Sequence, residues 1–262
     1  MIAALYGHSL EIHRKRSVLW QLVRQQLILR YRRTMLGYFW TLLNPLMMMV
    51  VSSVVFANLF QMDLRTYAVY LFAGTIPWNC FNTIVVQSGT SFVHNEGLIK
   101  KIYLPKAIFP LATSLGLLID NMLSFVALSI LIFALGGKFS LALAFLPVAY
   151  ALLFLFSFGL ALISSVLVVF FRDLQHVNGV FMQAWYYVTP IMYKSEALMG
   201  KAAWLIKINP VVPFITMFRA PICDGTLPPA GVVLQAAVLA AASMTLGVAF
   251  FLSQEKKVVF RL

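Results

Sequence analysis

A cluster of three arginines that runs directly into a long apolar segment is the feature that most restricts how this chain can fold. Arg30, Arg32 and Arg33 precede a segment that stays apolar from residue 37 to residue 60. A segment of this length exceeds the roughly 20 residues that an α-helix needs to cross the hydrocarbon core of a bilayer. Because lysines and arginines stay on the cytoplasmic side of a membrane, this junction predicts a membrane helix and its direction.

The composition extends this conclusion to the whole chain. Hydrophobic residues make up 61% of it and charged residues 11%, whereas a soluble domain carries roughly 25% charged residues. The apolar runs are long and continuous, which favours helices over the alternating strands of a barrel. The expected fold class is an all-α membrane protein. The net charge of +12 then predicts contacts with membrane lipids and not with nucleic acid.

Six segments are predicted to be transmembrane helices. The second is expected inside the bundle, because Gly74 and Pro77 interrupt it and breaks are tolerated only against protein or a wet cavity. The third contains Asp120, which should face the bundle or be protonated. The sixth carries small residues, including Ala236, Ala240 and Gly247, suited to close helix packing. The six segments are residues 37–60, 67–91, 111–135, 141–170, 178–193 and 230–252.

The distribution of basic residues sets the orientation. With both termini in the cytoplasm, 14 of the 20 lysines and arginines lie inside and 6 outside. We divide the chain into a cytoplasmic amphipathic region, residues 1–36, and one six-helix membrane domain, residues 37–262. Helical spacing of apolar residues over 18–28 predicts either an interfacial helix or a soluble helix that caps the bundle. The proline-rich stretch 194–229 predicts short re-entrant or interfacial helices on the outer face.

The chain contains no recognisable source of energy or catalytic motif. It lacks the phosphate-binding pattern G-x-x-x-x-G-K-[ST] and the H-E-x-x-H and G-x-S-x-G motifs. Asp120 is the acidic residue expected inside the membrane, which is too little for a proton relay. Cys80 and Cys223 are far apart and lack metal-ligand spacing. We therefore expect no catalytic residue, metal or cofactor in this chain, and a passive conduit driven by another protein.

Six pieces of the sequence, in order, resemble the ABC-2 type exporter permeases of the polysaccharide class. This class includes O-antigen, capsular polysaccharide and teichoic acid exporters, and the overall pattern resembles the O-antigen exporters most. The resemblance implies a homodimeric pore in the cell inner membrane with two separate ATP-binding subunits that use ATP and Mg. The cargo would be a glycan on undecaprenyl diphosphate. The pieces are residues 18–46, 73–81, 95–110, 170–177, 189–193 and 209–219.

The resemblance also implies roles for two inner loops. A short amphipathic helix over 95–103, with Asn95 as its cap, matches the family's coupling helix, which docks into the ATPase. Arg172 and Asp173 would form a second, smaller contact, or a simple ion pair that ends a helix. The alternative for the first loop is a helix on the membrane surface with snorkelling lysines. Expected anchors are Leu98, Ile99 and Ile102, and the residues expected to fix register are Glu96, Lys100 and Lys101.

Two further sets of residues are candidates for contacting the cargo. The region before Gly37 matches the family's gate helix, so that Arg30, Arg32 and Arg33 could hold the lipid diphosphate; plain anchoring of the membrane helix is the alternative. Aromatic rings could line the sugar path by stacking on pyranose faces, although lipid-facing or core packing is the alternative for each. These aromatic candidates are Trp78, Phe81, Phe181, Trp185 and Tyr193.

Two other function classes compete with a polysaccharide exporter. A drug or small-lipid exporter of the same superfamily would share the architecture, but the short outer loops argue against it. A membrane-embedded glycosyl or phosphate transferase would need clustered acidic residues or a metal site at one interface. The eight acidic residues of this chain are scattered along it.

Overall fold

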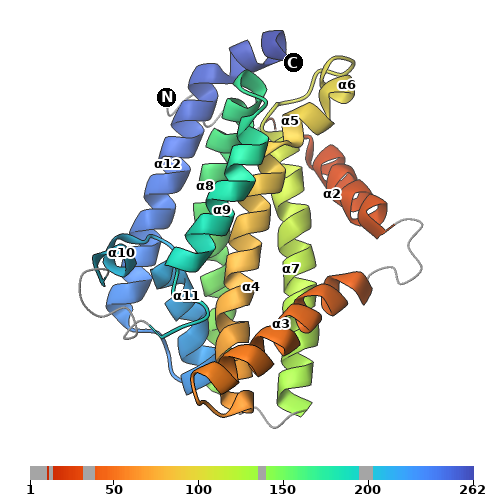
Figure 1. Ribbon diagram of the computed structural model, residues 1–262. Coiled ribbons are helices and arrows are strands. Elements are labelled where there is room, and N and C mark those ends of the chain that lie inside the picture. The colour runs from red at the N-terminus through yellow and green to blue at the C-terminus, as the bar shows by residue number, and fades with distance from the viewer. Residues whose placement is uncertain (1–10, 12–13, 32–38, 135–139, 195–202) are drawn as a thin grey trace.

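The computed structural model describes residue 11 and residues 14–31, 39–134, 140–194 and 203–262. All regular elements in these ranges are helices (Figure 1). Four of the described helices are long and apolar enough to cross a membrane: α4 (Leu64–Gly89), α7 (Ile108–Ala134), α8 (Leu146–Phe170) and α12 (Ala230–Arg261). The fold class is therefore that of an all-α, multi-pass membrane protein, as the sequence predicts.

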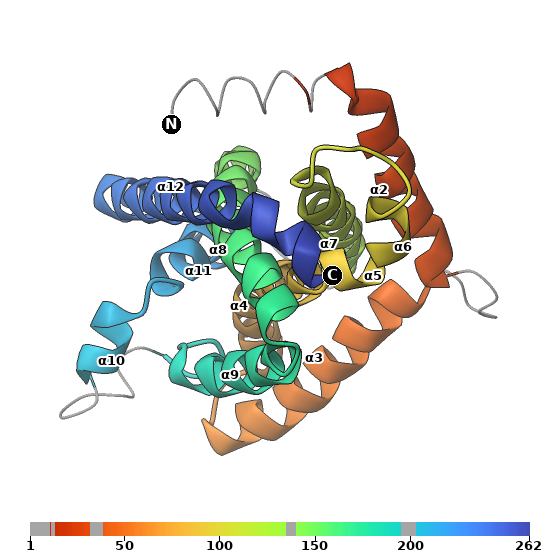
Figure 2. The same cartoon turned by 90° about the horizontal axis from the view of Figure 1, so that it is seen from above.

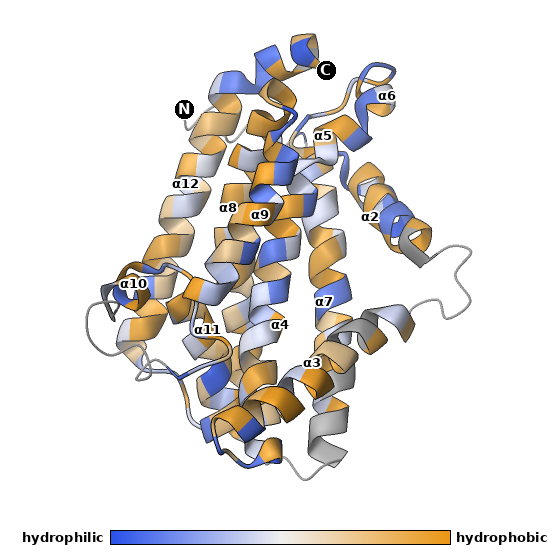
Figure 3. Ribbon diagram, in the orientation of Figure 1, coloured by the Kyte–Doolittle hydropathy of each residue, from blue (hydrophilic) through white to orange (hydrophobic). Residues whose placement is uncertain are grey.

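The four long helices form one bundle with two different ends. Seen from above, α8 lies between α4 and α12, and α7 flanks α4 (Figure 2). One end carries α5 (Ser91–His94), α6 (Glu96–Ile99) and the end of α12, and we call it the α6 end (Figure 1). The opposite end carries the turn before α4, the 3-10 turn η1 (Leu141–Phe145) and the start of α12. Hydrophilic residues concentrate at the α6 end, whereas the shafts of α8 and α12 are mainly hydrophobic (Figure 3).

Helix α4 is continuous through Gly74 and Pro77, so the predicted interruption is wrong. The side chains around it explain why a proline is tolerated there. Both residues are buried against neighbouring helices, where protein can satisfy a freed backbone group. The helix also begins three residues earlier than expected, because Asp63 caps it by accepting a hydrogen bond from the Thr66 N–H at 3.0 Å. This hydrogen bond lowers the pKa of Asp63.

Helix α2 (Arg16–Tyr31) combines features of an interfacial helix and of a soluble helix that caps the bundle, the two alternatives that the sequence leaves open. One face packs on α7, where Val23 is fully buried and Gln26 Nε2 donates to Thr113 Oγ1 at 2.7 Å. The other face exposes more than half of the Trp20 and Leu29 side chains. The helix therefore caps the bundle and still presents an apolar surface that suits a membrane interface.

Helix α3 (Phe39–Leu59) lies obliquely across the lower parts of α4 and α7 in Figure 1. Its inner side carries the buried residues Ser53 and Ala57. Its outer side exposes a continuous set of apolar side chains, which is the surface expected against lipid or another hydrophobic protein surface. This set consists of Met47, Met48, Val50, Val51, Val54, Val55 and Leu59.

The region between α8 and α12 contains short helices and no further element of full membrane length among the described residues. Helix α9 (Leu174–Val188) has 15 residues and is about 22 Å long, less than the roughly 30 Å of a hydrocarbon core. Helix α11 (Val212–Arg219) is buried in the bundle, and Phe214 and Phe218 have no exposed surface. Helix α10 (Ala203–Ile208), by contrast, exposes Trp204 and Ile208. Burial of α11 fits the re-entrant alternative.

Candidate coupling and conduction sites

The helix in the loop at the α6 end is shorter than the sequence predicts. Helix α6 spans only Glu96–Ile99, and the chain from Lys101 to Leu104 is not helical. Pro105 keeps only Leu104 out of the helical conformation, so it does not by itself explain why α6 ends as early as Ile99. Asn95 occupies the cap position, but its side chain donates to the Ser91 carbonyl oxygen at 2.8 Å and does not cap α6.

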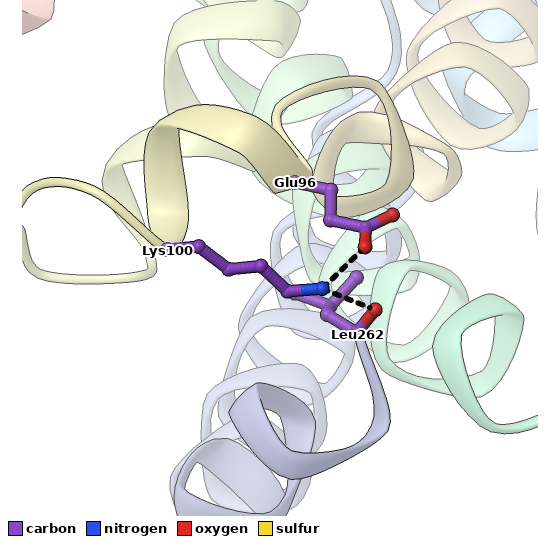
Figure 4. Close-up of polar contacts among 3 residues, drawn as sticks. All are labelled: Glu96, Lys100 and Leu262. Carbon is purple, nitrogen blue, oxygen red and sulfur yellow. Dashed lines mark hydrogen bonds and ion pairs between the residues drawn. The ribbon is translucent and has the colours of Figure 1, made fainter.

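Lys100 ties this loop to the end of α12. Its Nζ lies 2.5 Å from Glu96 Oε1 and donates to the Leu262 carbonyl oxygen at 3.0 Å (Figure 4). The hydrogen bond from Lys100 and its positive charge lower the pKa of Glu96. The pair is therefore fully formed above the ordinary pKa of a glutamate and is lost as the pH falls through the lowered value. Because both groups are partly exposed to solvent, the pair orients the loop more than it stabilises the fold.

The apolar residues of the loop divide into two groups. Leu98 and Ile99 pack against the core beneath them, which includes Phe92 and Val166. Ile102 is 51% exposed and Tyr103 is 87% exposed. Of the three expected anchors, Ile102 alone is more than half exposed. Tyr103 is an exposed aromatic residue outside the predicted set of anchors. Its position after two lysines and before the turn at Pro105 was the available signal.

The turn between α8 and α9 lies at the same end of the molecule. Arg172 and Asp173 are both exposed there, and the positive charge of Arg172 contributes to the lowered pKa of Glu96. Asp173 precedes α9 without a capping hydrogen bond from its side chain. Within the described ranges, the structure contains no ion pair between these two side chains. Arg172 is thus brought to the α6 loop, and the two turns form one polar surface.

The arginine cluster of the gate helix falls largely outside the described residues. Arg30 lies in the last turn of α2, and Arg32 and Arg33 precede the next described residue, Phe39. Their role in holding a lipid diphosphate stays a prediction.

Four of the five aromatic candidates come together in the structure. The rings of Trp78 and Phe81 lie 5.5 Å apart, the Trp185 ring lies 5.5 Å from that of Phe81, and Phe181 lies 5.3 Å from Trp185. Phe81 is fully buried, so within one protomer its ring serves as core. Trp78 is 3% exposed and also forms part of the wall of a cavity. Phe181 is exposed. Tyr193 lies apart from the cluster and donates its hydroxyl to the Tyr187 and Val188 carbonyl oxygens.

A cavity of about 1180 Å³ lies between α3, α4, α7 and α9, and its mostly apolar wall carries several polar groups. Asp120, which is 6% exposed, contributes to its wall and so faces the bundle as predicted. Asn121 donates to the Ile76 carbonyl oxygen at 3.4 Å and accepts from the Tyr150 hydroxyl at 3.2 Å. Carboxylate, amide and hydroxyl groups can exchange hydrogen bonds with a hydroxyl-rich molecule. Polar or aromatic lining residues include Thr75, Trp78, Asn79, Thr83, Asp120, Asn121, Ser124, Tyr186 and Tyr187.

Together, the membrane-length helices define a multi-pass helical membrane protein, and the cavity between them carries polar groups on a mostly apolar wall. The chain belongs to the ABC-2 type transporter family, whose family model matches residues 17–222.

Relatives with assigned names cover most of the chain. An O-antigen export system permease protein RfbA from Klebsiella pneumoniae is 30% identical over 207 residues, which is 79% of this chain and 80% of the relative. The protein of the same name from Myxococcus xanthus is 28% identical over 84% of this chain and 85% of its own length. The polysialic acid transport protein KpsM from Escherichia coli is 23% identical over 87% of this chain and 89% of its own length.

Proposed function

We propose that this chain is the permease subunit of an ABC transporter that exports a polysaccharide linked to undecaprenyl diphosphate, with O-antigen as the cargo class. The similarity to permeases named for O-antigen export, at up to 30% identity over four fifths of both chains, is the observation that carries this proposal. The carboxylate and amide groups in the wall of the cavity beside α4 support it, because such groups suit a hydroxyl-rich cargo.

The proposed assembly contains two copies of this chain in the cell inner membrane and two separate ATPase subunits at the α6 end. ATP and Mg belong to the ATPase, and this chain has no catalytic role. The exposed Ile102 and Tyr103 are the apolar contacts with the ATPase, while Glu96, Lys100 and Arg172 form the polar surface around them. We place both termini on the cytoplasmic side, and the position of the α12 end beside α6 supports this for the C-terminus.

Export of a capsular polysaccharide is the second candidate. The similarity to two proteins named for polysialic acid transport favours it, at 22% and 23% identity over 87% of the chain. Both candidates place a long glycan in the same pore, and they differ in the glycan that is carried.

Inverted inner-membrane vesicles provide the direct test. Vesicles that contain this chain and its ATPase, loaded from outside with a lipid-linked glycan, should protect the glycan from an added glycosidase when ATP is present. A variant of the ATPase that binds but does not hydrolyse ATP is the control. If protection is the same with and without hydrolysis, the proposal of an ATP-driven exporter is wrong.

The proposed orientation predicts opposite labelling of the two ends. In a Cys223→Ser background, where Cys80 is buried, Tyr103→Cys should react with a membrane-impermeant maleimide only in inverted vesicles. Leu141→Cys, which lies at the opposite end and replaces a side chain that is 96% exposed, should react only in intact spheroplasts. We expect at least about a tenfold difference for each site, because a charged reagent does not cross the hydrocarbon core. Labelling of both sites from one side would contradict the orientation.

A further inference from the structure

A second large cavity lies at the end of the bundle opposite α6. It has a volume of about 1390 Å³ and is bounded by α4, α7, η1, the start of α8, and the end of α11 with the π-turn η3 (Ala220–Asp224). This cavity is separate from the cavity between α3, α4, α7 and α9, since the two share no lining residue. The proposed conduction path does not use it.

Positive side chains dominate the charged part of its wall. Arg65, Lys194 and Arg219 line the cavity, and Asp224 is the acidic residue in its described lining. None of the three cations forms an ion pair with a carboxylate in the part of the chain that the structure describes. Three cations against one carboxylate give the cavity wall an excess of positive charge, which favours an anionic occupant.

Arg219 gives a second, independent indication. Its Nη2 donates to the Ile191 carbonyl oxygen at 2.8 Å, and its guanidinium carbon lies 3.8 Å from the centre of the Tyr70 ring. These contacts fix the plane of the guanidinium group. Its Nε is buried and has no hydrogen-bond acceptor. This Nε has almost no accessible surface and does not face the cavity. The guanidinium has five N–H donors in all, and Arg219 lines the cavity, so its fixed positive group is suited to an oxygen anion such as phosphate.

One side of the wall is an apolar face of α7. Met122, Val126 and Ile130 line the cavity at intervals of four residues and are themselves 36%, 56% and 65% exposed. They therefore provide an apolar surface that is continuous with the outside of the bundle. A cavity with cations on one side and an exposed apolar helix face on the other matches an amphiphile with a charged head and a hydrocarbon tail.

We infer that this cavity holds the phosphate headgroup of an anionic lipid, with the hydrocarbon chain against α7. The assignment of this lipid to the outer leaflet rests on the orientation proposed above. The binding of the lipid to the cavity does not depend on that orientation. The phosphate has two sources in such a membrane: the diphosphate of a polyprenyl carrier, or the phosphodiester of a bulk phospholipid.

Binding to the purified full-length chain in neutral detergent tests this inference without ATPase or export. Fluorescence anisotropy with a labelled farnesyl diphosphate measures affinity, and unlabelled competitors distinguish the sources. The variant Arg65→Gln/Lys194→Gln should weaken binding at least about tenfold, because it removes two charged phosphate contacts. The matched control Arg24→Gln/Lys207→Gln removes two exposed cations that do not line the cavity and should change affinity less than about twofold. Arg219 stays intact, because it also holds Ile191.

The competitors have defined outcomes. Displacement by phosphatidylglycerol as strong as by farnesyl diphosphate supports the headgroup site and assigns it to bulk phospholipid. Preference for the diphosphate supports the site and assigns it to the carrier. Equal displacement by phosphatidylcholine, equal affinity for inorganic diphosphate, or equal affinity in the variant and its control would each overturn the inference. A failure of glycan export in vesicles would leave this binding result unaffected.

Discussion

Replacing Gly247 with valine should drive α8 and α12 apart and prevent the bundle from assembling. A Cβ atom at Gly247 would meet the backbone of Gly159 at less than 3.0 Å, and a Cβ at Gly159 would meet the backbone of Ser243 equally closely. Backbone atoms cannot move aside as the end of a side chain can. Overpacked sites usually lose 1–3 kcal/mol, so we expect a loss of at least about 3 kcal/mol, or roughly a hundredfold in the folding equilibrium.

Gly231 in the same helix provides the matched control. A Cβ added there meets nothing within 4 Å, so Gly231→Val makes the same chemical change in α12 without a clash. Size-exclusion chromatography in detergent should show a single folded peak for Gly231→Val and the wild type, and an aggregated profile for Gly247→Val. A folded, stable Gly247→Val protein would mean that α8 and α12 do not approach this closely.

The packing of α12 was largely predictable from the sequence because small residues recur along one of its faces. Ala236, Ala240 and Gly247 were expected to form a close contact, and Ala236 and Ala240 are buried. Ser243 completes the same face and donates its hydroxyl to the Phe156 carbonyl oxygen at 2.8 Å. The partner helix was not predictable, because a small-residue face accepts any helix that approaches closely.

The number of membrane crossings was less predictable from the sequence. Hydropathy indicates that a segment has apolar surroundings, but it does not distinguish lipid from the core of the protein. Helix α11 and the end of α9 are apolar enough to pack in the bundle, yet too short to cross it. The continuous course of α4 through Pro77 has the same cause: surrounding protein decides whether a proline interrupts a helix. Sequence periodicity does not contain that information.

For the candidate sites, the sequence predicted the types of residue better than the arrangement of their side chains. The loop 95–103 was identified from its charge and apolar spacing, but Leu98 and Ile99 contact the core while Tyr103 is exposed. Trp78 and Phe81 were selected as aromatic rings for the sugar path, and the fold buries them within the protomer. The direction in which a side chain points depends on helices distant in sequence.

Replacing Tyr103 with aspartate should uncouple the transporter from its ATPase without affecting the fold. The side chain is 87% exposed and packs on little else, so the protein should fold with an unchanged melting temperature. In the proposed complex, the ring would lie in an apolar pocket of the ATPase, and truncation of such an anchor costs about 2 kcal/mol or more. We therefore expect affinity for the ATPase to fall at least about thirtyfold, with ATP-dependent export falling in parallel.

Two further variants make this expectation specific to the α6 loop. Tyr103→Phe keeps the ring and should retain most of the ATPase binding and export. Phe260→Asp changes another aromatic residue at the same end, in α12, whose side chain is 90% exposed, and should leave both activities near those of the wild type. Binding would be measured by surface plasmon resonance with the permease in nanodiscs and the ATPase in solution. If Phe260→Asp lost as much affinity as Tyr103→Asp, the contact would extend over the whole α6 end, because an exposed ring contributes only where a partner buries it.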